Sequence, residues 1–324
     1  MADELLSVRD LAVEFSVGGH FFGLGGSART LQAVNGVNLT LRAGECLGLV
    51  GESGCGKSTV GLSIVGLVPA TRGAITVDGM AIGADAAIDR RRLARTVQMV
   101  FQDPYASLNP RQTVRRTLAD PLRLHGVTNA GEVEDRVADM MRHVGLTADH
   151  ADRYPHEFSG GQRQRIGIAR ALILRPKLVI CDEPVSALDV SIRAQIINLL
   201  LELKESLGLS YIMISHDLGV VEHMSDRVAV MYFGRIVETG DWRTIFENPG
   251  HPYTRGLIAA IPDVFAPAGA SANKVRGEIP SPFDPPAGCA FHPRCPIAVD
   301  KCRTVPGPEL RPLGSTHEVS CWRA

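Results

Sequence analysis

The segment GESGCGKST, residues 51–59, constrains the fold more than any other part of this chain. It fits the phosphate-binding pattern of Gly, four residues and Gly-Lys-Ser, and it lies between the apolar segment ECLGLV (45–50) and an apolar helical segment near 57–67. Its glycines allow backbone N–H groups to turn inward around phosphate oxygens, and the positive end of the following helix adds to the attraction. Because a strand and a helix flank it, a chance Gly-rich turn is the less favoured interpretation. The segment predicts a nucleotide site in an α/β fold.

Two side chains of this phosphate loop carry the expected chemistry. Lys57 is placed to reach the β- and γ-phosphates of ATP, and Ser58 to ligate Mg²⁺. Cys55 is interpreted as a small side chain, because nothing in the sequence supports a redox role for it. The residues of this loop predicted to bind the nucleotide are Gly51, Ser53, Gly54, Cys55, Gly56, Lys57, Ser58 and Thr59.

A second segment, LVICDE (178–183), is an apolar strand that ends in two acids. A carboxylate at the carboxyl end of a strand beside a phosphate loop can hold Mg²⁺ through water, which suits Asp182. Glu183 follows it and is expected to polarise the attacking water as general base. On its own this pattern is usually a solvated strand end; the phosphate loop makes the functional interpretation the stronger one.

A third segment, EFSGGQRQRIGIARAL (157–172), places Ser159, Gly160 and Gly161 before an amphipathic helix. A helix N-terminus with adjacent glycines is another anion site. One nucleotide already held by the phosphate loop does not need it. We therefore expect a second subunit, with each subunit completing the other's site.

The remaining pattern alternates strands with helices and predicts an α/β chain. Two continuous apolar runs, KLVICD (177–182) and SYIMIS (210–215), are typical of parallel strands buried on both faces. The other segments expected to be regular are strands at 8–15 and 33–41, a helix at 190–207 and a charged helical region at 111–146. From about residue 262 the composition changes to Pro, Gly and Cys, and 262–274 is the expected linker.

Six motifs together resemble the ATP-binding cassette (ABC) ATPases. They occur in that family's order and are GESGCGKST, FQDP (101–104), SGGQ (159–162), LVICDE, SALD (186–189) and ISHD (214–217). The resemblance covers roughly residues 5–260. It implies a P-loop cassette with a mixed sheet core, an antiparallel β subdomain and a helical subdomain at about 105–170, within a domain 1–261 followed by a small extension 262–324. Phe158 stands where many cassettes have Leu.

The resemblance also implies roles at matched positions. Gln102 would contact Mg²⁺ or the attacking water, His216 would sense the γ-phosphate, and Asp189 would communicate across a dimer. Without the other motifs, Gln102 would be a surface loop amide and His216 a core histidine. The resemblance assigns Ser159, Gly160, Gly161 and Gln162 to the partner's nucleotide.

An aromatic side chain upstream of the phosphate loop is expected to stack on adenine. Phe15, at the end of the first strand, is the candidate. Phe21 and Phe22 are the alternatives, and Phe15 could equally belong to the core.

The expected mechanism needs other subunits. Two cassettes would close on two ATP molecules and open after hydrolysis. No apolar run approaches the ~20 residues that span a bilayer, and the N-terminus does not resemble a secretory signal. The force would therefore go to two integral membrane permease subunits, docked at YASLNP (105–110) on the cytoplasmic face of the membrane. The net charge of −1 argues against nucleic acid as the main partner.

The end of the chain suggests a branch of the family. NPGHPYTRGLIAAIP (248–262), followed by a Pro-rich extension with cysteines, resembles the ATPase subunits of dipeptide/oligopeptide importers. That resemblance implies a heterodimer of two such subunits and an extracytoplasmic substrate-binding protein. Related importers carry nickel, opines or short sugars. HPYT alone could be only a helix start.

Four cysteines lie in the extension, and their spacing leaves three interpretations open. Five, six and eighteen residues separate Cys289, Cys295, Cys302 and Cys321, which is wider than usual zinc or ferredoxin patterns. They could be unpaired thiols, a Zn²⁺ site completed by His292 or His317, or a [4Fe–4S] cluster. The cluster is favoured, because the extension resembles one that holds it in related dipeptide-transporter ATPases. So short a segment is not expected to bury a core of its own, and a metal would supply the missing folding energy.

Two other functions fit the sequence less well. A soluble nucleic-acid-associated cassette ATPase would carry coiled coils, a second cassette or basic arms, and this sequence has one cassette and 34 basic against 35 acidic residues. An ATPase of iron–sulfur assembly would explain the cysteines but leave HPYT unexplained.

Overall fold

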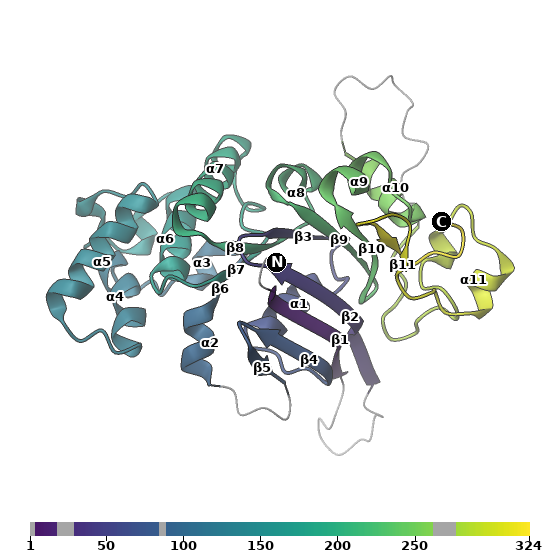
Figure 1. Ribbon diagram of the computed structural model, residues 1–324. Helices are drawn as coiled ribbons and strands as arrows, with labels where there is room; N and C mark the ends of the chain where they lie inside the picture. Colours follow the sequence, from purple (N-terminus) through teal and green to yellow (C-terminus); the bar gives the residue numbers. More distant parts are fainter. Residues whose placement is uncertain (1–3, 18–28, 84–88, 262–276) are drawn as a thin grey trace, which may run out of the picture.

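The computed structural model describes residues 4–17, 29–83, 89–261 and 277–324. Within these residues the centre is an eight-stranded sheet in the order β11-β12-β10-β9-β3-β8-β7-β6 (Figure 1). The strands β9, β3, β8, β7 and β6 run parallel, and β10 and β12 are antiparallel to their neighbours. The bounds are β3 Cys46–Val50, β6 Val97–Val100, β7 Leu178–Asp182, β8 Ser210–Ser215, β9 Arg227–Tyr232, β10 Arg235–Asp241, β11 Arg311–Pro312 and β12 Glu318–Val319.

Helices cover both faces of this sheet, which is why its central strands read as continuous apolar runs. Every residue of β7 and β8 is buried. Val179 and Cys181 join one hydrophobic core with helices α6 and α7, whereas Leu178 and Ile180 join a second core with α1. The helix bounds are α1 Lys57–Ile64, α6 Gly160–Leu172, α7 Val190–Leu207, α8 Leu218–Met224, α9 Trp242–Glu247 and α10 Pro252–Ile258. The predicted helix at 190–207 is confirmed with its bounds.

A smaller antiparallel sheet packs on the same core as α1. Its order is β2-β1-β4-β5. Its strands are β1 Glu4–Val17, β2 Arg29–Arg42, β4 Arg72–Val77 and β5 Met80–Ile82. The two N-terminal strands expected at 8–15 and 33–41 are therefore present and pair with each other.

The region between β6 and β7 is helical and forms the left end of the molecule in Figure 1. Its helices contact one another through a shared apolar core that includes Leu118, Val137 and Ile166. Their bounds are α3 Pro104–Ser107, α4 Val114–Leu124, α5 Ala130–His143 and then α6, and α2 Arg90–Thr96 precedes β6.

The C-terminal extension packs against the cassette beside β10 and α10 (Figure 1). It contains a short helical turn η4 (His292–Arg294), helix α11 (Asp300–Thr304) and the strand β12, which pairs with β10. The extension was not expected to bury a core of its own, and its buried residues include one that joins a core of the cassette. Phe291 and Val319 are buried, and Phe291 joins a core with Tyr232 and Tyr253 of the cassette. The extension thus completes a shared core. The predicted linker at 262–274 lies outside the described residues.

Glu238 fixes this docking from the cassette side. Its side chain is fully buried, and it accepts hydrogen bonds from the backbone N–H groups of Gly250 and His251. Its Oε1 also lies 2.7 Å from Nε2 of His317 in the extension. A buried carboxylate is stable only when such partners satisfy it, so this cluster holds the extension in one position.

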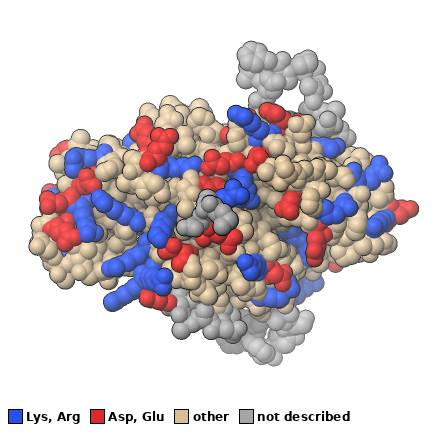
Figure 2. All heavy atoms as spheres, viewed as in Figure 1, with Lys and Arg blue, Asp and Glu red and all other residues tan. Residues whose placement is uncertain are grey.

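The described residues on the side of the molecule in Figure 2 form no strongly basic face. Figure 2 shows Lys and Arg interspersed with Asp and Glu over the side in view. None of the helices in the described part of the chain combines the length and apolar character needed to cross a membrane.

Candidate nucleotide and hydrolysis site

The phosphate loop joins the end of β3 to the start of α1 and is packed tightly on both sides. Gly51 and Gly56 have φ angles of 154° and 105°, where side chains are rarely tolerated. A Cβ on Gly51 would lie 2.2 Å from the carbonyl oxygen of Met231, and one on Gly56 would lie 2.3 Å from that of Ala33. Both positions therefore need glycine, for conformation and for space.

Lys57 is held inside this loop. Its side chain is buried, and its Nζ donates hydrogen bonds to the carbonyl oxygens of Gly51 at 2.7 Å and Glu52 at 2.9 Å. Cys55 is buried beside it, and burial raises the pKa of its thiol. The thiol is thus kept protonated, which agrees with its interpretation as a small side chain.

Ser58 and Asp182, two of the three predicted magnesium ligands, meet directly. The Ser58 hydroxyl donates to Oδ1 of Asp182 at 3.0 Å, from α1 to the end of β7. Burial raises the pKa of the Asp182 carboxyl, against the opposing effect of the Ser58 hydrogen bond. Oxygen donors of this kind suit Mg²⁺, and a cation here would offset the cost of burying the carboxylate. The residues fit the ion.

The three predicted catalytic residues meet at one carboxylate. Gln102 donates from Nε2 to Oε2 of Glu183 at 2.9 Å, and Nδ1 of His216 lies 3.0 Å from Oε1 of Glu183. Glu183 has a φ of 47°, a left-handed conformation that is costly for a residue with a side chain. Its N–H donates to the carbonyl of Ile214. The end of β8 therefore holds this strained residue in place, with its side chain 14% exposed.

The signature segment forms the start of α6. Ser159 is the N-cap, and it and Gln162 exchange hydrogen bonds in a capping box. A Cβ on Gly161 would lie 2.5 Å from Cγ2 of Ile192, so glycine lets α6 approach α7 closely. Within the described residues, no hydrogen bond joins this segment to the phosphate loop.

Phe158 and Asp189 were also singled out in the sequence, and both lie near the signature segment. Phe158 is buried, and its ring lies edge-on to that of His150 at 5.2 Å, so this position serves as an apolar contact. Asp189 is exposed at the start of α7, and its side chain makes no cap hydrogen bond. Val190 beside it is 80% exposed.

The adenine-stacking residue stays a prediction. Phe15 lies in β1 opposite Leu31 of β2, and it is 37% exposed. Phe21 and Phe22 lie outside the described residues.

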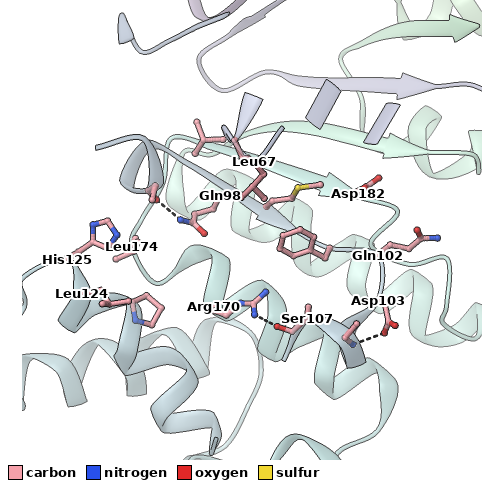
Figure 3. Close-up of a pocket in the computed structure, with 17 residues that line it drawn as sticks. Leu67, Gln98, Gln102, Asp103, Ser107, Leu124, His125, Arg170, Leu174 and Asp182 are labelled. Atoms are coloured by element: carbon pink, nitrogen blue, oxygen red, sulfur yellow. Dashed lines mark hydrogen bonds between the residues drawn. The ribbon is translucent and has the colours of Figure 1, made fainter. Parts of the chain in front are cut away.

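A large groove, which the sequence patterns did not reveal, opens beside the hydrolysis site (Figure 3). Its volume is about 770 Å³, and its lining includes Asp182, Gln102 and Arg170. Arg170 donates to the carbonyl of Ser107 in α3 (Figure 3). The lining also contains Leu67 and Leu124, which are 63% and 72% exposed. The nearest sequence signal was YASLNP, whose Ala106 and Ser107 line the groove.

The cysteines of the extension do not form the predicted ligand set. Cys289, Cys295, Cys302 and Cys321 are all free, and all line one cavity of about 20 Å³, roughly enough for one water. Burial raises the pKa of the Cys289 and Cys295 thiols. Among the residues that the structure describes, no three His, Cys, Asp or Glu side chains are arranged to hold a metal ion. Neither the predicted [4Fe–4S] cluster nor the zinc alternative is supported by this geometry.

Comparison with protein families gives two matches. Residues 34–186 match the model described as ABC transporter, and residues 237–302 match the one described as oligopeptide/dipeptide transporter, C-terminal region.

Curated relatives match over nearly the whole chain. The oligopeptide transport ATP-binding protein OppF of Salmonella typhimurium is 51% identical, over 98% of this chain and 95% of the relative. The di/tripeptide transport ATP-binding protein DppF of Pseudomonas aeruginosa is 46% identical, over 99% and 98%.

Among solved structures, the dimeric post-hydrolysis state of the ATP-binding cassette MJ0796 bound to ADP and Pi is similar, with a TM-score of 0.63 and 26% identity over 74% of this chain and 99% of that one. The cbiO1 structure from Clostridium perfringens, part of the ABC transporter complex cbiONQ, has a TM-score of 0.64 and 28% identity, over 76% and 92%.

Proposed function

Because the chain belongs to the ABC transporter ATP-binding proteins that carry the oligopeptide/dipeptide C-terminal region, we propose that it hydrolyses ATP to energise the import of dipeptides or oligopeptides. The observation that carries this proposal is a set of three contacts at the ends of β7 and β8. Ser58 meets Asp182, and Gln102 and His216 meet Glu183.

Each residue has a role in the proposed reaction. The phosphate loop and Lys57 bind the triphosphate, and Glu183 takes a proton from the attacking water as general base. Gln102 and His216 orient the Glu183 carboxylate and contact the water and the γ-phosphate. Ser58 and Asp182, with Gln102, would hold Mg²⁺, which neutralises charge on the phosphates.

A second cassette subunit is part of the proposal. The capped start of α6 makes no hydrogen bond to this chain's own phosphate loop within the described residues, so its glycine N–H groups are offered to a nucleotide on another subunit. The exposed Asp189 and Val190 lie at the start of the adjacent helix α7 and suit the same contact. By family analogy the partner is a related, non-identical ATPase.

Two permease subunits are proposed to dock on the groove of Figure 3. Its exposed Leu67 and Leu124 suit an inserted apolar segment, and its lining reaches Gln102. Tyr105, next to the lining residue Ala106 in α3, is 63% exposed, and the guanidinium of Arg163 lies over its ring, 4.0 Å from the centroid. Movement of a permease segment in the groove would be transmitted through α3 to Gln102 in the hydrolysis site. The chain would thus work at the cytoplasmic face of the membrane, supplied by an extracytoplasmic binding protein.

The test is transport by the assembled complex. We expect vesicles that contain the chain, its partner ATPase and the permease subunits to take up oligopeptides when ATP and loaded binding protein are supplied. Glu183→Gln should abolish uptake and retain ATP binding. Glu222→Gln, an exposed change on α8, is the matched control. Uptake of nickel, an opine or an oligosaccharide without peptide uptake would overturn the substrate class.

A further inference from the structure

The C-terminal extension reaches back to the phosphate loop. Arg294, in the turn η4, donates from Nη1 and Nη2 to the two carboxylate oxygens of Glu52 at 2.6 and 2.8 Å. Glu52 is the second residue of GESGCGKST, yet no role was assigned to it from the sequence. We propose that Arg294 is a positioning residue for the nucleotide site, so that ATP affinity depends on the docked extension. This inference rests on the proposed nucleotide site.

The Arg294–Glu52 contact is built as a strong one. A guanidinium that meets a carboxylate through two parallel hydrogen bonds is fixed in direction as well as in distance. The Arg294 side chain is 5% exposed and that of Glu52 is 26% exposed, so water screens the pair little. The guanidinium also lies over the ring of Tyr232, 5.8 Å from its centroid. Such burial separates this pair from ordinary surface ion pairs.

A second contact from the end of the cassette holds the same residue by its backbone. The Glu52 N–H donates to the hydroxyl of Tyr253 at 2.8 Å. Tyr253 is fully buried, with its ring centroid 4.7 Å from that of Tyr232 and 5.4 Å from that of Phe291. HPYT is thus a helix start, since His251 caps α10 and Pro252 begins it, and it is also the element that aims Tyr253 at the phosphate loop.

Glu52 links these anchors to the ammonium group of the site. Its carbonyl oxygen accepts the hydrogen bond from Lys57 Nζ at 2.9 Å. One residue is therefore held by Tyr253 at its N–H, by Arg294 at its side chain and by Lys57 at its carbonyl. A shift of the extension would move the backbone that positions Lys57.

The positive charge of Arg294 determines whether its removal weakens or strengthens ATP binding. Arg294 neutralises a carboxylate that belongs to the loop meant to receive a triphosphate. Without the guanidinium, that carboxylate would add a negative charge beside the phosphates and repel them. Removal of Arg294 should therefore weaken ATP binding, and simultaneous removal of the Glu52 charge should relieve most of the loss.

The experiment is a double-mutant cycle on ATP affinity, measured with the full chain and a fluorescent ATP analogue in the presence of Mg²⁺. We expect Arg294→Met to weaken binding about three- to tenfold, and Arg294→Lys to restore part of it. In the Glu52→Gln background, the same Arg294→Met change should alter the Kd less than about twofold, because the two effects are coupled. The control is Arg303→Met, the same change at an exposed position of α11, which should leave affinity unchanged.

A purely structural Arg294 would give a different pattern. The midpoint of unfolding would fall and the Kd would stay the same, or the Kd would rise by the same factor with and without the Glu52 charge. Either result overturns the inference. Absence of ATP binding by the unsubstituted chain would instead refute the nucleotide site itself, so the two failures are distinguishable. Restoration of affinity by Glu52→Gln supports the inference even if Arg294→Met lowers stability.

Discussion

The nucleotide site and the cysteine cluster differ in how their residues come together. In the nucleotide site, residues from distant motifs form direct contacts, such as Ser58 with Asp182 and Gln102 with Glu183. In the extension, four cysteines close in sequence line a single cavity but are not arranged as a ligand group. The backbone explains the difference. Parallel strands bring their carboxyl ends to one edge, whereas an irregular Pro-rich segment imposes no such order on its side chains.

Polar side chains of the extension contact the cassette directly. His317 meets the buried Glu238, and Arg294 meets Glu52 of the phosphate loop. We therefore expect substitutions in the nucleotide site to have the largest effects, on the rate of hydrolysis. Substitutions in the docking contacts should lower stability, and changes at the thiols should have the smallest effects.

The largest effect is expected at Glu183. Glu183→Gln should lower kcat for ATP about 10²–10⁴-fold, because the amide cannot accept the proton from water. ATP binding should persist, since the phosphate loop is untouched. Steady-state hydrolysis and nucleotide binding measure the two separately. Cys321→Ser in the extension is the contrasting variant and should retain turnover. Normal hydrolysis by Glu183→Gln would contradict the role of Glu183 as general base. Loss of hydrolysis in Cys321→Ser would show that the extension's thiols matter for turnover.

The next effect concerns docking of the extension. Glu238→Ala should lower the free energy of unfolding by about 3 kcal/mol, because two buried backbone N–H groups and His317 lose their acceptor. Urea denaturation of the full chain measures it. Glu318→Ala, an exposed change in β12, is the matched control and should cost little. Equal losses in the two variants would show that the Glu238 cluster does not fix the extension.

Regular elements and motif positions could be predicted from the sequence. The runs at 177–182 and 210–215 are central strands because continuous apolar patterns need two covered faces. Asp182 and Glu183 then fall at a strand end by register alone. The left-handed backbone of Glu183 could not be predicted from the strand pattern, because it depends on the hydrogen bond to the carbonyl of Ile214.

Long-range side-chain contacts could not be predicted in this way. Arg294 and Glu52 are 242 positions apart, and no periodicity connects them. The groove of Figure 3 forms where α2, β6, α3 and α4 meet, so its lining has no single sequence pattern. The [4Fe–4S] prediction rested on a resemblance and not on a tight ligand spacing, and within the described residues no three His, Cys, Asp or Glu side chains are arranged to support it.

The smallest expected effect is on thiol reactivity, and it tests the other half of the comparison. Burial raises the pKa of the Cys289 and Cys295 thiols above the ordinary value of a cysteine. Since only the thiolate reacts, alkylation at these positions should be slower in the folded chain than in urea at pH 8. The gap should narrow as the pH rises through the folded-state pKa. Mass spectrometry of the alkylated peptides, after anaerobic purification, measures both rates. A different result would be protection of these thiols from alkylation at every pH, abolished by a chelator, in a protein that contains stoichiometric iron and sulfide or zinc. That result would show that the thiols bind a metal, and the extension would then hold a second ordered site.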